Sequence, residues 1–290
     1  LLLGGLPRPV GVSLTGGATL EFAGVRKDDF VYDLPAAGVA GDPAMWLEVS
    51  SGITTDASGE HVLRWDDVRG GDRPHVYSRN EKLKPQLVKG ADGTAVSVLL
   101  PCDATSASAD DQAILMWSRP LSNIRAVFIV KSAYQGGGQF LGGANGMWMR
   151  PAATGYRSYP LFNNGTKSSY PALANGRFYV NGERRSVDDG YAYPGGTTNG
   201  MALADWKPQL AEFLTAGNAS ADNFAYNAGG LGRTGRQILH AAIVYTNELT
   251  EVERLATERY LLDRYRLMDV QVPDPAALAG SVGALELDGE

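Results

Sequence analysis

The sequence predicts an all-β fold, an antiparallel β-sandwich with one amphipathic helix near its C-terminal end. Short apolar runs recur along the chain, each bounded by Gly, Pro, Asn or Asp, and their β-branched residues favour strands. The 36 Gly and 15 Pro are scattered, which indicates many turns. Many short strands with few helices are typical of a sandwich or jelly roll. Strands are predicted at residues 45–49, 62–65, 96–100, 113–117, 126–130, 178–180 and 238–245.

The predicted helix covers residues 250–267. It begins with a capping box, in which the Thr250 side chain accepts a bond from a backbone N–H and Glu253 reaches back to the cap. Pro273 and Pro275 follow it and end the ordered pattern. The apolar face is expected to comprise Val252, Leu255, Leu262 and Tyr265, with Arg254, Glu258 and Asp263 pointing away from it.

The breaker-rich stretches divide the chain into three parts. Residues 1–43 are predicted to be a strand segment and a linker, residues 44–270 the sandwich domain, and residues 271–290 a linker and the start of a following repeat. Residues 17–24 and 282–289 alternate in the same way, so at least one terminal segment is expected to pair with a sheet edge, in this chain or another. Because the chain begins without Met, we expect it to come from a longer protein.

Composition and charge favour an ordinary globular domain. Hydrophobic residues make up 44% of the chain and charged residues 20%, with a net charge of −6. The 26 basic residues are dispersed, which argues against nucleic acid or an anionic membrane as a partner. No apolar stretch approaches the roughly 20 residues that span a bilayer, so no membrane insertion is expected. Cys102 is the only cysteine, so no disulfide can form within the chain.

Several motifs resemble one known family. Trp46-Leu47-Glu48, then Trp65-Asp66-Asp67, look like the opening of bacterial laminin-G-like domains, members of the concanavalin A-like lectin and glucanase superfamily. Residues 126–130 resemble the family's central strand, and Asn181-Gly182 suits the type I′ turn of its hairpin. Residues 242–254 resemble its final strand and the start of its closing helix.

The resemblance implies a concanavalin A-like jelly roll, secreted or displayed on a cell surface, over residues 44–267. Laminin-G-like domains often hold calcium, and loop carboxylates such as Asp110-Asp111 and Asp188-Asp189 suit a hard cation, but the sequence assigns no metal ligands. Ala241 is a departure, because family members often carry an acidic residue near that position.

No catalytic residues are assigned. A retaining glycosidase needs two carboxyl groups about 5–5.5 Å apart, and no Glu/Asp string with period-two spacing supplies such a pair. Glu248, Glu251 and Glu253 are explained by the start of the helix. Residues 230–235 match G-x-G-x-x-G but lead into a predicted strand, where a nucleotide site needs a helix. His240 is expected to be packed or hydrogen-bonded rather than catalytic.

Aromatic residues in Gly- and Asn-rich segments are the candidate ligand-binding residues. Their rings can stack on sugar faces while polar neighbours supply directional hydrogen bonds. By contrast, Trp46, Trp65 and Trp117 lie in apolar runs and are expected in the core. The candidate binding residues are Trp148, Tyr156, Arg157, Tyr159, Asn163, Tyr191 and Tyr193.

Three classes of function remain open. The preferred one is a non-catalytic recognition or adhesion module that binds a glycan or surface polysaccharide. The alternatives are a structural spacer or self-assembling surface or filament subunit, and an atypical glycoside hydrolase with dispersed catalytic residues.

Overall fold

A computed structural model describes residues 38–101, 113–133, 141–143, 146–148, 171–185, 208–224 and 237–267. All seven predicted runs overlap strands of this structure, and the predicted C-terminal helix is present. The elements in chain order are β1 (Met45–Glu48), β2 (Ile53–Thr55), β3 (Val62–Trp65), β4 (Val76–Ser78), β5 (Gln86–Lys89), β6 (Ala95–Leu100), β7 (Leu115–Ala133), β8 (Leu141–Gly143), β9 (Gly146–Trp148), α2 (Pro171–Ala174), β10 (Arg177–Val180), β11 (Glu183–Arg185), β12 (Gln209–Phe224), β13 (Gln237–Tyr245) and α3 (Glu251–Arg264).

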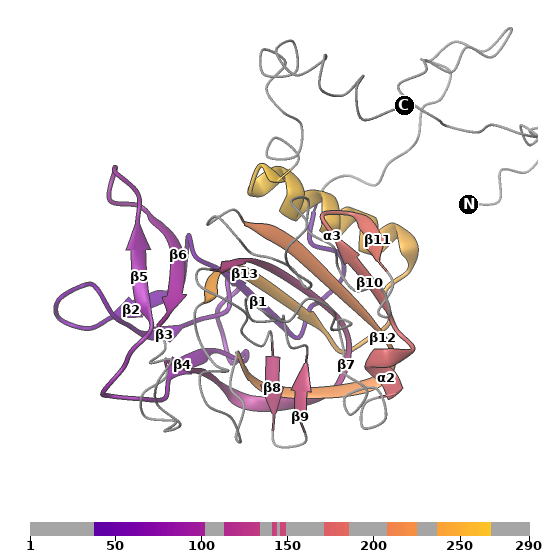
Figure 1. The fold of residues 1–290 in the computed structure, drawn as a ribbon, viewed down its shortest axis with the longest axis horizontal. Coiled ribbons are helices and arrows are strands. Elements are labelled where there is room, and N and C mark those ends of the chain that lie inside the picture. The colour runs from indigo at the N-terminus through magenta and orange to yellow at the C-terminus, as the bar shows by residue number, and fades with distance from the viewer. Residues whose placement is uncertain are drawn as a thin grey trace, which may run out of the picture. The chain divides into compact units, whose positions relative to one another are not determined.

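The described part of the chain is mostly β, with one large antiparallel sheet. Thirteen described strands are connected by hydrogen bonds, and the main path runs β11-β10-β12-β7-β13-β6-β5 (Figure 1). Along one edge of β13 lie both β6 and β1, and β7 pairs with its other edge. The β10–β11 hairpin turns through Asn181 and Gly182, both at positive φ (48° and 81°), as the predicted type I′ turn requires.

Two long strands, β7 and β12, run through two groups of strands. The first group includes β3 and β4, and the second includes β10 and β13. Leu115–Trp117 at the start of β7 pairs with β4, whereas residues 126–133 of the same strand pair with β13. Between these parts the pairing of β7 with β12 shifts register after Leu214. Pro120 lies in this irregular stretch, where a missing N–H is tolerated. The Thr215 hydroxyl donates to the carbonyl of Ile124 (3.0 Å), so a side chain replaces part of the ladder there.

Alternate residues of the central strands enter two different cores. Val127 and Ile129 of β7 belong to an inner core, which also contains Trp65 of β3 and Trp117. Phe128, on the opposite face of β7, belongs to a helix-side core that includes residues of α3. The expected burial of Trp65 and Trp117 is confirmed (1% and 3% exposed). Trp46 is only half-buried and packs at the edge of the helix-side core.

Helix α3 covers the face of β12, β7 and β13 that bears the helix-side core (Figure 1). The capping box is confirmed: Thr250 Oγ1 accepts from the backbone N–H of Glu253 (3.2 Å), whose carboxylate accepts from the Thr250 N–H (2.8 Å). Among the described residues, no helix has the length and apolarity that crossing a membrane requires.

The predicted orientation of this helix is partly wrong. Val252 is 52% exposed, and Leu255 is only half-buried. Arg254 and Glu258, expected to face solvent, are buried at 3% and 8% exposure. The physical reason is a buried acceptor on the sheet: the Arg254 guanidinium donates to the buried Glu212 carboxyl group (2.8 Å) and lies over the Tyr179 ring (4.2 Å). Leu262 is buried as predicted.

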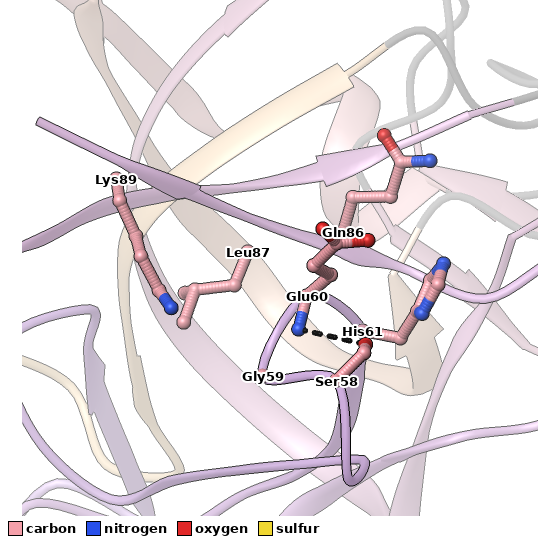
Figure 2. A pocket seen from close by; sticks show the side chains of 7 residues that line it. All are labelled: Ser58, Gly59, Glu60, His61, Gln86, Leu87 and Lys89. Carbon is pink, nitrogen blue, oxygen red and sulfur yellow. Dashed lines mark hydrogen bonds between the residues drawn. The ribbon is translucent and has the colours of Figure 1, made fainter. Parts of the chain in front are cut away.

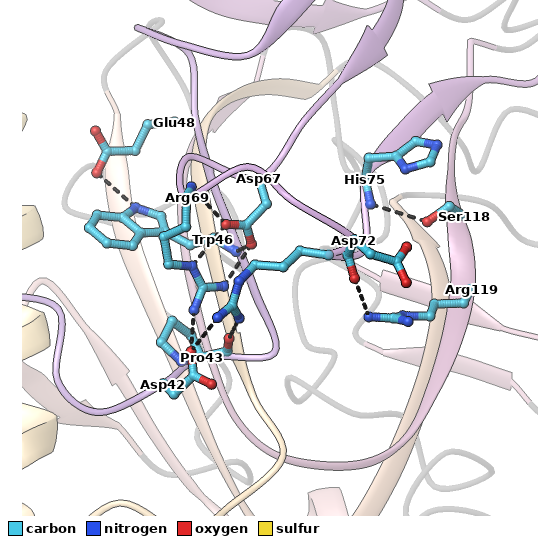
Figure 3. A network of polar contacts seen from close by, with 11 residues as sticks. Asp42, Pro43, Trp46, Glu48, Asp67, Arg69, Asp72, His75, Ser118 and Arg119 are labelled. Atoms are coloured by element: carbon cyan, nitrogen blue, oxygen red, sulfur yellow. Dashed lines mark hydrogen bonds and ion pairs between the residues drawn. The ribbon is translucent and has the colours of Figure 1, made fainter.

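The Trp-rich motifs of the resemblance form a structural polar network (Figure 3). The Asp67 carboxylate accepts the backbone N–H of Trp46 (2.7 Å) and is held by the Arg69 guanidinium (2.7 and 2.8 Å). Trp65 Nε1 donates to the Glu48 carbonyl (3.1 Å). Asp67 and the backbone of Val68 thus bond to Trp46 on the edge of β1 that faces away from β13. Asp66 and Asp67 lie in the loop after β3, and Asp67 is buried.

Candidate functional site

Most of the aromatic candidates lie outside the described residues. Tyr156, Arg157, Tyr159 and Asn163 fall in residues 149–170, and Tyr191 and Tyr193 fall in residues 186–207, two ranges that the structure does not describe. Trp148 ends β9, and its backbone pairs with that of Leu141 in β8. The candidate site below is therefore built from other residues.

A tight turn between β2 and β3 supplies one wall of this site. The Asp56 carboxylate organises it, accepting from the Ser58 hydroxyl (2.6 Å) and bonding His61 Nδ1 (2.8 Å). The Ser58 bond and the neighbouring His61 hold the pKa of Asp56 well below its ordinary value. Gly59 adopts φ +72°, a conformation that few other residues tolerate. The backbone of Asp56 also bonds that of His61 (2.9 Å), which closes the turn.

Strand β5 supplies the other wall. The backbone of His61 forms a bridge to Gln86, and the Leu87 N–H donates to the Glu60 carbonyl (2.7 Å). These bonds fix the turn against β5. Between them lies an open groove of about 450 Å³, and its lining residues come from both walls (Figure 2): Ser58, Gly59, Glu60, His61, Gln86, Leu87 and Lys89.

The groove offers mixed hydrogen-bonding chemistry. Glu60 supplies acceptors, Lys89 supplies donors, and Gln86 supplies both. In Figure 2 Lys89 and His61 lie at opposite ends, with Glu60 and Leu87 between them. Glu60 is the single carboxylate among the described residues that line the groove. One carboxylate with an amide, an ammonium and a hydroxyl can bind a polyhydroxylated ligand, whereas acid–base cleavage of a glycosidic bond needs two carboxyl groups.

The described residues also bear on two predictions from the sequence, a possible calcium site and a packed or hydrogen-bonded His240. Within the described ranges, no group of three or more His, Cys, Asp or Glu side chains is placed to hold a metal ion. His240 is hydrogen-bonded as expected, its Nδ1 donating to the Val96 carbonyl (2.9 Å), and burial lowers its pKa. Residues 230–235 are not described, but the segment after them is strand β13, as predicted.

Sequence reasoning missed the groove. The polar turn at residues 56–61 between two apolar runs is a hairpin signal, and it could have drawn attention to Glu60 and His61. Nothing in the sequence places Gln86 and Lys89 beside that turn, because they are some 25 residues away and meet it only through strand pairing.

Comparison of the chain with protein-family models, curated proteins and solved structures finds no significant match.

Proposed function

We propose that this chain is a non-catalytic carbohydrate-recognition and adhesion module of a larger secreted or cell-surface protein. The observation that carries the proposal is the groove between the 56–61 turn and β5. Its donors and acceptors are mounted on a hydrogen-bonded turn and a strand, so the backbone that carries them is held in place before a ligand binds. Glu60 offers hydrogen-bond acceptors, Lys89 offers donors and Gln86 offers both, and a ligand with adjacent hydroxyl groups can bond to all three.

We further propose that the sheet closes as a concanavalin A-like sandwich. Support comes from the inner core. It contains Trp65 of β3 and Trp117 at the start of β7, from the first group of strands, together with Val127 of β7 and Val244 of β13, from the second group. Side chains from both groups therefore pack in one cluster, as the two inner faces of a sandwich do. The register shift of β7 and β12 marks where one group would fold over the other.

A glycan array is the direct test of recognition. We expect binding to neutral glycans and a loss of about tenfold in affinity for Lys89→Ala, since a charge-assisted hydrogen bond is removed. Lys84→Ala is the matched control, because Lys84 pairs with Glu81 and does not line the groove. Wild-type binding to no glycan, or equal losses for the two variants, would contradict the proposed groove.

The loop aromatics are proposed as a second contribution to the same recognition. Alanine at Trp148, Tyr156, Tyr159, Tyr191 or Tyr193 is expected to weaken glycan binding without unfolding the domain, because each ring can stack on a sugar face. If all five variants bind as the wild type does, the aromatics take no part. A chain that binds no glycan and self-associates would support the spacer or filament alternative instead.

A further inference from the structure

A second cavity, of about 370 Å³, lies at the C-terminal end of α3 and does not share residues with the groove. Its walls are apolar, with Val49, Val96 and Pro208 among the lining residues, and Val96 is 40% exposed. Its polar side chains are mainly cationic or neutral donors, notably Arg264 and Arg266, and none of the described residues that line it is a carboxylate. Apolar walls with a few convergent polar groups are typical of small-ligand sites.

His240 enters this cavity because β13 has a β-bulge. The pairing of β13 with β7 passes from Leu239 directly to Ala241, so His240 is the extra residue. Its carbonyl leaves the ladder with β7 and accepts from the Val49 N–H (3.0 Å) and the Tyr265 hydroxyl (3.1 Å). Bulges of this kind are frequent beside functional sites, where they re-aim a side chain.

Arg266 has an unusual backbone conformation. Its φ of +51° is left-handed, directly after the C-cap of α3, where glycine or asparagine is usual. Glycine would adopt this conformation without strain but would supply no guanidinium. A strained non-glycine residue that lines a cavity is a reason to look for a function.

Arg264 is oriented by the protein before any ligand binds. Its guanidinium donates to the Ser50 hydroxyl (3.0 Å) and lies 3.5 Å from the Glu48 carboxylate. Glu48 is itself buried and already accepts from Trp46 Nε1 (2.9 Å) and the Tyr260 hydroxyl (2.5 Å). Glu48 and Ser50 therefore hold the Arg264 guanidinium in place, and Arg264 and Arg266 together bring one more charge to the cavity than Glu48 offsets.

We propose that this cavity binds a carboxylate carried on a compact body with an apolar face. Arg264 and Arg266 bind the carboxylate, for which a guanidinium is the best-matched side chain, while Val96 and Tyr265 pack against the body. An acidic sugar and a simple aromatic acid both have this chemistry. The site is independent of the neutral-glycan groove, so either proposal can fail without the other.

The test is an NMR titration that follows the backbone amide signals of Val96, His240 and Arg266. The probes are galacturonate, benzoate and galactose. Galacturonate is expected to shift these signals, galactose is not, and 0.5 M NaCl is expected to weaken binding by several-fold. If benzoate shifts them as well, the carboxylate site is supported and the ligand extends beyond sugars. No shift with either acid, or equal shifts with galactose and galacturonate, would overturn the proposal.

Arg266→Gly separates binding from stability. We expect galacturonate affinity to fall about tenfold or more. The melting temperature should stay the same or rise, because glycine relieves the positive φ. Arg259→Ala, an exposed helix position outside the cavity with the same change of charge, should keep wild-type affinity. Unchanged affinity in Arg266→Gly, or an equal loss in both variants, would contradict the assignment.

Discussion

Asp66 and Asp67 are adjacent in sequence but differ in burial, and therefore in how much each contributes to the stability of the fold. Asp66 pairs with Arg64 at the surface (2.6 Å), where both side chains are more than a third exposed. Asp67 is 4% exposed and receives two backbone N–H groups, those of Trp46 and Arg69, as well as the Arg69 guanidinium. Exposed ion pairs contribute little, whereas breaking a buried one leaves unpaired groups.

Asp67→Ala is therefore expected to lower the free energy of unfolding by about 3 kcal/mol, because the buried Trp46 N–H loses its acceptor and Arg69 keeps only the exposed Asp42 as an ion-pair partner. Asp66→Ala should cost less than about 1 kcal/mol. Urea denaturation of the two variants measures this difference directly. Similar losses for both would show that Asp67 does not support the edge of β1.

A second residue-scale prediction concerns the pKa of Glu212. Burial, together with the neighbouring Glu258 carboxylate, raises this pKa well above its ordinary value, although Arg254 opposes the shift. Among the described residues no donor reaches the buried Glu212 Oε1, so the ionised form lacks stabilisation at that oxygen. Three carboxylates contact the single Arg254 guanidinium, those of Glu212, Glu251 and Glu258, so full ionisation is unfavourable.

The sign of the pH effect follows from linkage. Above about pH 4.5 the unfolded chain loses the Glu212 proton while the folded protein keeps it, so this contribution to stability declines as pH rises through the folded-state pKa. Glu212→Gln should remove that decline and be at least as stable as wild type at alkaline pH. Thermal melts at several pH values test it. A variant that loses most stability at high pH would instead show that Glu212 is ionised and paired.

At the scale of the element, α3 docks through a narrower apolar stripe than its sequence suggests. Leu261 is fully buried in the helix-side core, with Leu262 beside it, whereas Val252 points outward. The hydrogen-bonded pair of Arg254 and Glu212 also lies in this interface. The helix periodicity alone could not identify this face, because Glu212 lies 42 residues away on β12.

Leu261→Ala should destabilise the protein by about 2–4 kcal/mol, since it removes buried methyl groups and leaves a cavity. Val252→Ala should change stability by less than about 0.5 kcal/mol, because that side chain is half in water. Chemical denaturation monitored by circular dichroism compares them. Equal losses would contradict docking through Leu261, and a larger loss for Val252→Ala would favour the face predicted from sequence.

At the scale of the whole molecule, the sequence predicted the parts that local patterns determine. The seven apolar runs, the Asn181-Gly182 turn and the Thr250 capping box depend on neighbouring residues, and all are present. The 16-residue strand β12 is not among the predicted runs. Two separate runs are predicted where the single strand β7 lies, because Pro120 and the polar residues around it resemble a loop. Sheet order and the groove depend on long-range pairing, which one sequence does not reveal.

The terminal segments remain a prediction at this scale, since residues 1–37 and 268–290 lie outside the described residues. We expect residues 12–24 or 282–289 to pair with a sheet edge, because an unpaired alternating strand exposes a row of backbone donors and acceptors. Deleting residues 1–37 should lower the melting temperature or the molecular mass measured by light scattering. A truncated chain with unchanged stability and association would contradict pairing by the N-terminal segment.

The most direct test of the central claim combines binding and turnover on one glycan. The best array ligand is titrated by isothermal calorimetry and then incubated with the protein for a day while reducing ends are measured. We predict saturable binding and no release of reducing ends, with Glu60→Gln weakening the binding and Glu81→Gln, an exposed control outside the groove, leaving it unchanged. Release of reducing ends that disappears in Glu60→Gln would contradict the account and identify a hydrolase.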